Sequence, residues 1–263
     1  MKSIAIIPAR MAASRFPGKP LVKINGIPMI GHIYHRTTLK KCFDEVYVAT
    51  CDQEIVDYIE SIGGKAVMTA DTHERCTDRT AEALQKIEAA SGIKYDIIGM
   101  VQGDEPTVVP DVFVKALDAL RASSDLSIVN IMNMITSDDE FRSPNSVKVI
   151  IDKNSNAITF SREPIPSNKK FNGEYPKYRQ TGLIFFKRDF LIEFNNMAPT
   201  MLEEVESVDM MRLIENGIKV KMILAEQKCL YVDIPEHIGI VEDYLKSETL
   251  FQSYRGTFGV EYE

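Results

Sequence analysis

Short apolar runs alternate with segments of helical periodicity through the first half of the chain. The runs that predict strands are rich in isoleucine, valine and alanine and lie at residues 4–7, 45–50, 65–68 and 96–101. The segments with apolar residues three and four positions apart, which predict helices, lie at residues 28–40, 53–62, 76–90 and 111–122. This alternation predicts an α/β fold with a mostly parallel sheet and crossover helices.

The second half of the chain has a different pattern. Its apolar runs predict strands with few helices between them, at residues 126–134, 147–151, 157–160 and 181–186. Helical periodicity returns at residues 205–216, a strand is predicted at 219–225, and a final helix begins at Pro235. We therefore expect an α/β half at 1–125, an inserted β-rich subdomain at 126–200, and a return to the α/β part at 201–263.

Three cations follow the first predicted strand. Arg10, Arg15 and Lys19 lie among small residues, and Pro17-Gly18 with Pro20 excludes a helix there. Ligands of open parallel sheets bind beyond the carboxyl ends of the strands, and guanidinium and ammonium groups suit phosphate oxygens. The loop therefore predicts a site for a polyanion, with a solvated basic loop as the alternative. It matches neither the Walker nor the dinucleotide-binding glycine pattern.

Composition narrows the choice of ligand. The chain has 263 residues and a net charge of −7, which argues against a nucleic-acid binder and favours a small anionic ligand. No apolar run is long enough to span a membrane, and the start of the chain leaves no room for a signal peptide. Four scattered cysteines fit a reducing cytoplasm, and His73 and Cys76 alone do not make a zinc site.

Two acidic segments could hold a divalent cation. Asp104 follows a predicted strand in Gln102-Gly103-Asp104-Glu105-Pro106, where a carboxylate can bind Mg²⁺ together with phosphate oxygens. The alternative for Asp104 is a turn with a helix-capping acid. Asp233 precedes Pro235, and its alternative is likewise the N-cap of the last helix.

Three of these segments carry a family resemblance. The pattern from Ile6-Ile7-Pro8-Ala9-Arg10 to Pro17-Gly18-Lys19-Pro20-Leu21 resembles the nucleotide-binding loop of bacterial 3-deoxy-manno-octulosonate cytidylyltransferases, which make CMP-activated sugar acids. Gln102 to Pro106 resembles their metal-binding segment. Tyr231 to Glu236 resembles their V-D-T-P-E segment, whose acid completes the magnesium site, with Ile234 in place of the threonine. The resemblance runs from Ile4 to about Leu245. It implies a Rossmann-like, mostly parallel sheet of the nucleotide-diphospho-sugar transferase type with a β-rich inserted subdomain.

The resemblance also implies residue roles. The catalytic residues would be Arg10, Arg15, Lys19 and Asp104. The nucleotide contacts would be Pro8, Ala9, Arg10, Lys19, Thr77, Arg79 and Gln102. The metal ligands would be Asp104 and Asp233, with Mg²⁺ as the cofactor. In the segment from His73 to Arg79, which would contact cytosine and ribose, Arg75 and Cys76 replace the family's serine and glycine, so base selectivity is less well defined than triphosphate binding.

The acceptor side departs most from the family. The implied acceptor-binding residues are Arg162, Gln180, Ile184, Asp209 and Met210. Gln180 and Ile184 replace a histidine and a tyrosine, Asp209 shortens a glutamate, and Met210 replaces a glutamine. For Arg162, a surface salt bridge is the alternative. Lost hydrogen-bonding partners change the discrimination of a polar substrate, so we expect a modified acceptor, with unchanged specificity as the alternative.

The expected activity is therefore Mg-dependent transfer of CMP from CTP to an acidic sugar, 3-deoxy-manno-octulosonate or a modified relative, with release of pyrophosphate. The resemblance further implies a role in lipopolysaccharide biosynthesis, a cytoplasmic location and a homodimer formed through residues 126–200. The alternatives are a cytidylyltransferase for a small phosphonate, a glycosyltransferase using a preformed sugar nucleotide, and a non-catalytic nucleotide-binding regulator.

Overall fold

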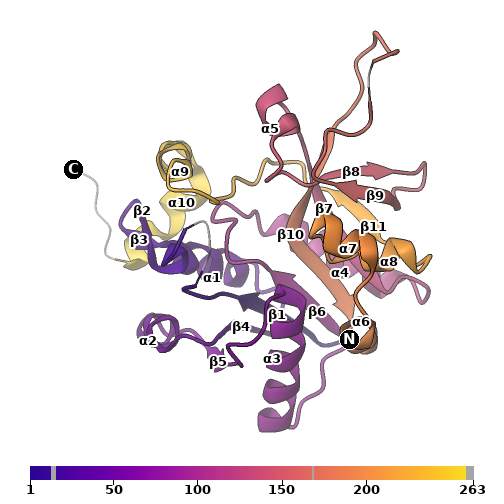
Figure 1. The fold of residues 1–263 in the computed structure, drawn as a ribbon. Helices are drawn as coiled ribbons and strands as arrows, with labels where there is room; N and C mark the ends of the chain where they lie inside the picture. Colours follow the sequence, from indigo (N-terminus) through magenta and orange to yellow (C-terminus); the bar gives the residue numbers. More distant parts are fainter. Residues whose placement is uncertain (13–15, 168, 259–263) are drawn as a thin grey trace. The chain divides into compact units, whose positions relative to one another are not determined.

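A computed structural model shows a protein of the α/β class with a mixed, largely parallel sheet (Figure 1). The structure describes residues 1–12, 16–167 and 169–258. The chain divides into two compact units. We call residues 4–93, 101–110 and 229–263 the N-terminal unit, and residues 1–3, 94–100 and 111–228 the central unit. The predicted fold class is confirmed.

Parallel strands form the core of the N-terminal unit. Its main strands are β1 (Ser3–Pro8), β4 (Glu45–Thr50) and β5 (Ala66–Met68), and its helices are α1 (Met29–Leu39), α2 (Gln53–Ser61), α3 (Cys76–Ser91), α9 (His237–Ser247) and α10 (Thr249–Tyr254). β1 is buried along its whole length and pairs with β4, which pairs with β5. A strand covered on both faces requires a continuous apolar run, which Ile4 to Ile7 supplies.

The central unit is richer in antiparallel pairing. Its strands are β6 (Ile97–Val101), β7 (Ile128–Met134), β8 (Lys148–Ile151), β9 (Ala157–Ser161), β10 (Tyr178–Lys187) and β11 (Lys221–Leu224). Its helices are α4 (Asp111–Ala122), α5 (Asp138–Arg142), α6 (Arg188–Asn196), α7 (Met201–Glu206) and α8 (Met210–Glu215). Strand order is β11-β7-β10-β6; β10 is antiparallel to β7 and β8, whereas β11 is parallel to β7.

Several expected elements differ in detail. The prediction of a single helix at 205–216 is wrong. The helix is interrupted between α7 and α8 at Ser207, whose φ is 50°. At this break the backbone carbonyls of Glu206 and Ser207 accept hydrogen bonds from Arg162 Nε (2.6 Å) and Nη2 (3.1 Å). These tertiary contacts outweigh the local helical preference of the segment.

Some short elements had no clear signal in the sequence. The β2–β3 hairpin (Lys23–Ile24 and Ile27–Pro28) and helices α5 and α6 were not expected. The cationic loop contains one 3₁₀ turn, η1 (Lys19–Leu21), where only an irregular turn was predicted. A second, η2 (Arg255–Phe258), follows α10. Within the described ranges, no helix is both long and apolar enough to cross a membrane.

Candidate active site

The cationic loop begins where β1 ends and is closed by backbone hydrogen bonds. The Met11 amide donates to Asp52 Oδ2 (2.7 Å), which ties the start of the loop to the end of β4. The Gly18 amide donates to the Met11 carbonyl (2.9 Å). Gly18 has a φ of 75°, a left-handed conformation that glycine adopts without steric cost. Arg15, predicted to be catalytic, lies outside the described residues.

A pocket of about 140 Å³ opens beside this loop within the N-terminal unit. Its lining residues come from the end of β1, the cationic loop, the start of α3 and the segment after β6. They are Pro8, Ala9, Arg10, Lys19, Pro20, His73, Glu74, Arg75, Cys76, Arg79, Gln102, Gly103 and Asp104. Four of them are Lys or Arg and two are acids. The pocket therefore presents an excess of positive charge to a ligand, as a polyphosphate requires.

Lys19 joins the two acidic segments. Its Nζ donates to the Val232 carbonyl (2.8 Å) and lies 3.8 Å from Asp104 Oδ2 and 3.8 Å from Asp233 Oδ1. The Val232 amide donates to the Asp104 carbonyl (2.9 Å), so the backbones of the two segments are also bonded. Two carboxylates that are far apart in the sequence thus converge on one ammonium group.

Close packing of two backbones shapes the same region. A Cβ added at Gly103 would lie 3.1 Å from the Pro8 carbonyl oxygen, closer than ordinary van der Waals contact. The absence of a side chain at Gly103 therefore lets the acidic segment approach the end of β1. This approach brings Gln102 and Asp104 to the lining of the pocket beside Arg10.

The start of α3 contributes a buried guanidinium. Arg79 is buried and donates through Nη1 to the Thr69 hydroxyl and to the Ala70 carbonyl (3.2 Å). Its Nη2 is buried and has no hydrogen-bond partner among the described residues. An unpaired buried donor at the edge of a pocket is available to an acceptor atom of a ligand.

Neighbouring contacts fix the loop before α3. His73 Nε2 is hydrogen-bonded to Glu82, and the His73 carbonyl accepts from Arg10 Nη1 (3.4 Å). Desolvation would raise the pKa of Glu82, but Lys86, the Ala70 amide and His73 outweigh it and lower this pKa to about 2. Glu82 is therefore ionised at neutral pH and holds His73 at the edge of the pocket.

The structure brings most predicted nucleotide and metal residues together. Pro8, Ala9, Arg10, Lys19, Arg79, Gln102 and Asp104 line the pocket, and Asp233 lies beside Lys19. Thr77 is an exception, because it is buried in α3 and does not line the pocket. The functional roles of these residues stay predictions.

Sequence reasoning missed several lining residues. Glu74, Arg75, Cys76, Gly103 and Pro20 line the pocket although no role was predicted for them as individual site residues. The signal that could have found Glu74, Arg75 and Cys76 is their position within the segment that resembles the family's base-reading loop. Arg75 and Cys76 are also the two positions at which that segment departs from the family pattern.

All five predicted acceptor residues belong to the central unit. Arg162 donates to three backbone carbonyls, those of Glu206 (2.6 Å, from Nε), Pro144 (2.8 Å, from Nη1) and Ser207 (3.1 Å, from Nη2). These hydrogen bonds do not test the predicted acceptor role of Arg162, which stays a prediction. They hold the turn between α7 and α8 against the end of β9.

The other predicted acceptor residues differ in exposure. Gln180 is partly exposed on β10 and donates to Asn130 Oδ1 (2.7 Å) on β7. Ile184 and Met210 are buried, and Asp209 is the half-buried N-cap residue of α8. Binding of an acceptor by these residues stays a prediction.

The residues around Lys19 fit a divalent cation. Asp104 and Asp233 converge on a position next to the pocket, and an ammonium group already lies between them. Magnesium prefers one or two carboxylates together with substrate oxygens. The described residues contain no cluster of three or more side chains that could hold a metal ion, so an ion here would depend on phosphate oxygens or water for its remaining ligands.

Comparison with known sequences gives a consistent result. A family model described as cytidylyltransferase matches residues 4–226. A 3-deoxy-manno-octulosonate cytidylyltransferase of Geobacter metallireducens is 39% identical over 255 residues, which cover 93% of this chain and 98% of that protein. One of Parabacteroides distasonis is 40% identical over 245 residues, covering 90% and 95%.

Comparison with solved structures agrees. CMP:2-keto-3-deoxy-manno-octonic acid synthetase, solved in complex with CTP, superimposes with a TM-score of 0.84 at 32% identity, covering 94% of this chain and 99% of that one. A cytidylyltransferase from Leptospira borgpetersenii, 15% identical with a TM-score of 0.62, shares the fold.

Proposed function

This chain belongs to the 3-deoxy-manno-octulosonate cytidylyltransferase family, and we propose that it transfers CMP from CTP to an acidic sugar with release of pyrophosphate. The observation that carries the proposal is the pocket of about 140 Å³ in which Arg10, Lys19 and Arg79 lie together with Asp104. It combines cations for a triphosphate with an acid that suits a divalent cation.

The proposed reaction forms one bond and breaks one. An acceptor oxygen attacks the α-phosphorus of CTP, the bond from that phosphorus to the bridging oxygen of the β-phosphate breaks, and the electron pair leaves with pyrophosphate. The acceptor hydroxyl transfers its proton to solvent water. Arg10, Arg15 and Lys19 would bind the β- and γ-phosphates and neutralise the charge that develops on them. Such catalysis depends on positioning and electrostatic stabilisation.

Magnesium is part of this proposal. Asp104 and Asp233 would hold the ion, supported by their convergence on Lys19. When bound, Mg²⁺ supplies charge neutralisation at the phosphates and lowers the pKa of a coordinated hydroxyl. Lys19 would orient both carboxylates. Its hydrogen bond to the Val232 carbonyl would keep the neighbouring Asp233 close to Asp104.

The acceptor is proposed to be a modified relative of 3-deoxy-manno-octulosonate, such as an amino- or deoxy-substituted sugar acid. Support comes from Gln180 and its bond to Asn130, which present amide groups in place of the family's imidazole. Ile184 and Met210 add apolar bulk where the family has polar side chains. An altered set of hydrogen-bonding groups changes which substituents are accepted.

The experiment is a pyrophosphate-release assay of four nucleoside triphosphates against a panel of acidic sugars and phosphonates. The proposal predicts release with CTP and an eight-carbon sugar acid. A higher kcat/KM for the unmodified sugar would refute the altered acceptor preference while leaving the activity class intact. Release with a phosphonate alone, or no release with any acceptor, would refute transfer to a sugar acid.

We also propose that the protein is a cytoplasmic homodimer. The four cysteines form no disulfide in the part of the chain that the structure describes, in keeping with a reducing compartment. Met201 and Val205 expose apolar side chains one turn apart on α7, which supports self-association. Sedimentation equilibrium should give twice the chain mass of 29.7 kDa.

A further inference from the structure

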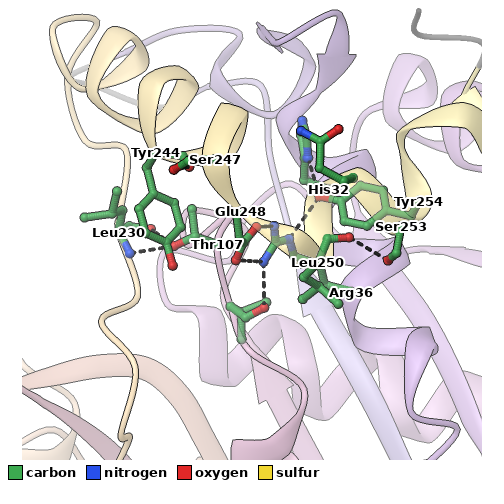
Figure 2. A network of polar contacts seen from close by, with 12 residues as sticks. His32, Arg36, Thr107, Leu230, Tyr244, Ser247, Glu248, Leu250, Ser253 and Tyr254 are labelled. Carbon is green, nitrogen blue, oxygen red and sulfur yellow. Dashed lines mark hydrogen bonds and ion pairs between the residues drawn. The ribbon is translucent and has the colours of Figure 1, made fainter.

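A buried arginine in α1 has no place in the mechanism described above. The Arg36 side chain is completely buried, although long cationic side chains are rarely buried unless paired. Its Nη1 and Nη2 bond to the two carboxylate oxygens of Glu248, immediately before α10 (Figure 2). Nε donates to the Tyr254 hydroxyl (3.0 Å). Elements far apart in the sequence thus meet at one guanidinium.

The hydrogen-bond directions around Tyr254 follow from the groups present. His32 Nε2 lies 2.9 Å from the Ile24 carbonyl, which can only accept, so Nε2 carries the proton. Nδ1 is then the acceptor, and the Tyr254 hydroxyl donates to it (2.7 Å) while accepting from Arg36 (Figure 2). We call Arg36, Glu248, Tyr254 and His32 the C-terminal clamp. Within this clamp the three guanidinium nitrogens of Arg36, both ring nitrogens of His32 and the Tyr254 hydroxyl all have hydrogen-bond partners.

The clamp extends to the acidic segment after β6. Arg36 Nη1 also donates to the Val108 carbonyl (3.3 Å), and the Val108 amide donates to the Glu105 carbonyl (3.1 Å). One residue earlier, the Thr107 hydroxyl accepts from the Leu230 amide (2.6 Å; Figure 2). Arg36 therefore fixes the far end of the segment that carries Asp104.

The segment after β6 is also hydrogen-bonded to the residues that precede Asp233. Leu230 and Val232 precede Asp233, and their amides bond to Thr107 and to the Asp104 carbonyl. The segments 104–108 and 230–233 are therefore held side by side by a backbone hydrogen bond and by the Thr107 hydroxyl. α9 and α10 continue directly from the second segment and return the chain to Arg36.

We propose that Arg36 is a positioning residue that, through Glu248 and Tyr254, fixes the distance between Asp104 and Asp233. The inference rests on the proposed function, because that function makes Asp104 and Asp233 ligands of the same Mg²⁺ ion. Neither Arg36 nor Tyr254 lines the pocket. Their effect reaches the site through the backbone of residues 104–108, where a small displacement of a ligand group is costly.

The test compares two adjacent hydroxyl deletions on α10. Tyr254→Phe removes the hydroxyl that bonds Arg36 and His32. Ser253→Ala is the matched control, because among the described residues the Ser253 hydroxyl bonds only the Leu250 carbonyl of its own helix (2.7 Å; Figure 2). Amide hydrogen exchange is measured on the full-length protein at Val108, Leu230 and Val232, with the β4 amides as an internal reference. The Mg²⁺ concentration for half-maximal pyrophosphate release is measured in parallel.

In Tyr254→Phe, exchange at the three amides should accelerate about tenfold while β4 keeps its rate, and the half-maximal Mg²⁺ concentration should rise severalfold. Ser253→Ala should match wild type in both. Unchanged exchange and Mg²⁺ dependence in a folded Tyr254→Phe would overturn the proposal, as would uniform acceleration that includes β4.

If Tyr254→Phe does not fold, Glu248→Gln, which keeps the side-chain size and removes the charge, is judged by the same criteria. If wild type releases no pyrophosphate with any acceptor, the proposed function fails. The exchange measurement then still decides whether the clamp orders these segments.

Discussion

The ammonium of Lys19 lies at equal distances, 3.8 Å, from carboxylate oxygens of Asp104 and Asp233. Lys19→Ala should lower kcat/KM for CTP by about 100-fold or more, because it removes a preorganised charge from the pocket. The free energy of unfolding should change by only about 1 kcal/mol, as Lys19 lies in a loop. Steady-state kinetics and urea denaturation measure the two effects.

Lys23 provides the matched control for that substitution. It is an exposed lysine four residues further along, on β2 and outside the pocket. Lys23→Ala should retain wild-type kinetics. Equal losses of activity in the two variants, or wild-type activity in Lys19→Ala, would remove Lys19 from the phosphate-binding site.

Asp104 gives a second prediction at the residue scale. A chelator should abolish activity, and Asp104→Asn should lower kcat/KM by about 100-fold, because an amide is a weaker ligand for a hard cation than a carboxylate. Excess CTP alone should not restore the rate, since the nucleotide does not replace a protein ligand. Pyrophosphate release over a matrix of CTP and Mg²⁺ concentrations measures this.

Asp118→Asn is the corresponding control, because Asp118 is an exposed acid on α4 that pairs with Arg121 at 3.5 Å. It should leave the Mg²⁺ dependence unchanged. A rate in wild type that persists after metal removal would exclude both Asp104 and Asp233 from metal binding in the mechanism.

At the scale of elements, the contact between the segment after β6 and the end of β1 leaves little room for an added side chain. Gly103→Ala would introduce a Cβ 3.1 Å from the Pro8 carbonyl oxygen, and backbone would have to move. We expect the dissociation constant for CTP to rise about tenfold, because both sides of this contact line the pocket. The affinity for CTP is measured by isothermal titration calorimetry.

Gly239→Ala is the comparison for this variant. Gly239 is an exposed position on α9 where an added Cβ meets nothing within 4 Å. It should stabilise the helix by up to about 1 kcal/mol and leave CTP binding unchanged. An affinity for CTP in Gly103→Ala equal to that in Gly239→Ala would show that the close approach has no functional role.

Elements with strong periodicity were predictable from the sequence, and those shaped by tertiary contacts were not. The helix predicted at 111–122 has the bounds of α4. Its apolar face identifies the segment as a helix, and the preceding Pro110 marks where the helix begins. The prediction of one helix at 205–216 failed, because Ser207 has a φ of 50° and Arg162 bonds the backbone carbonyls of Glu206 and Ser207 at the break between α7 and α8. A pattern confined to neighbouring residues carries no information about such partners.

At the scale of the whole molecule, stability should depend on acidity through His32. Burial lowers the pKa of His32 to about 4, below the value of about 6.5 expected in the unfolded chain. Between these values the unfolded protein binds more protons, so the free energy of unfolding falls as pH decreases from 6.5 to 4. The loss should be on the order of 3 kcal/mol. Urea denaturation at a series of pH values measures it.

His32→Gln isolates this contribution, because an amide can accept from Tyr254 but does not titrate. Its stability should change less between pH 6.5 and 4 than that of wild type. Glu82, with a pKa of about 2, loses its contribution only below its unfolded value of about 4.5, so the two effects occupy different ranges. Identical pH profiles in His32→Gln and wild type would contradict the prediction.

The candidate site was more predictable than the network that supports it. Arg10, Lys19 and Asp104 follow predicted strands, and the carboxyl ends of strands are where ligands bind in this fold class. His32 and Arg36 gave no comparable signal, because their partner Tyr254 lies 222 and 218 residues further along the chain. On sequence alone they are polar residues of an amphipathic helix.

The convergence of Asp104 and Asp233 on Lys19 also has a consequence during translation. Asp233 is synthesised 214 residues after Lys19, which takes on the order of 10–40 s at typical elongation rates. Until then a ribosome-bound chain carries the cationic loop without Asp233. A chain released by a stop codon anywhere before position 233 therefore lacks the second carboxylate. We expect such a product to keep the cationic loop and to be inactive in the transfer.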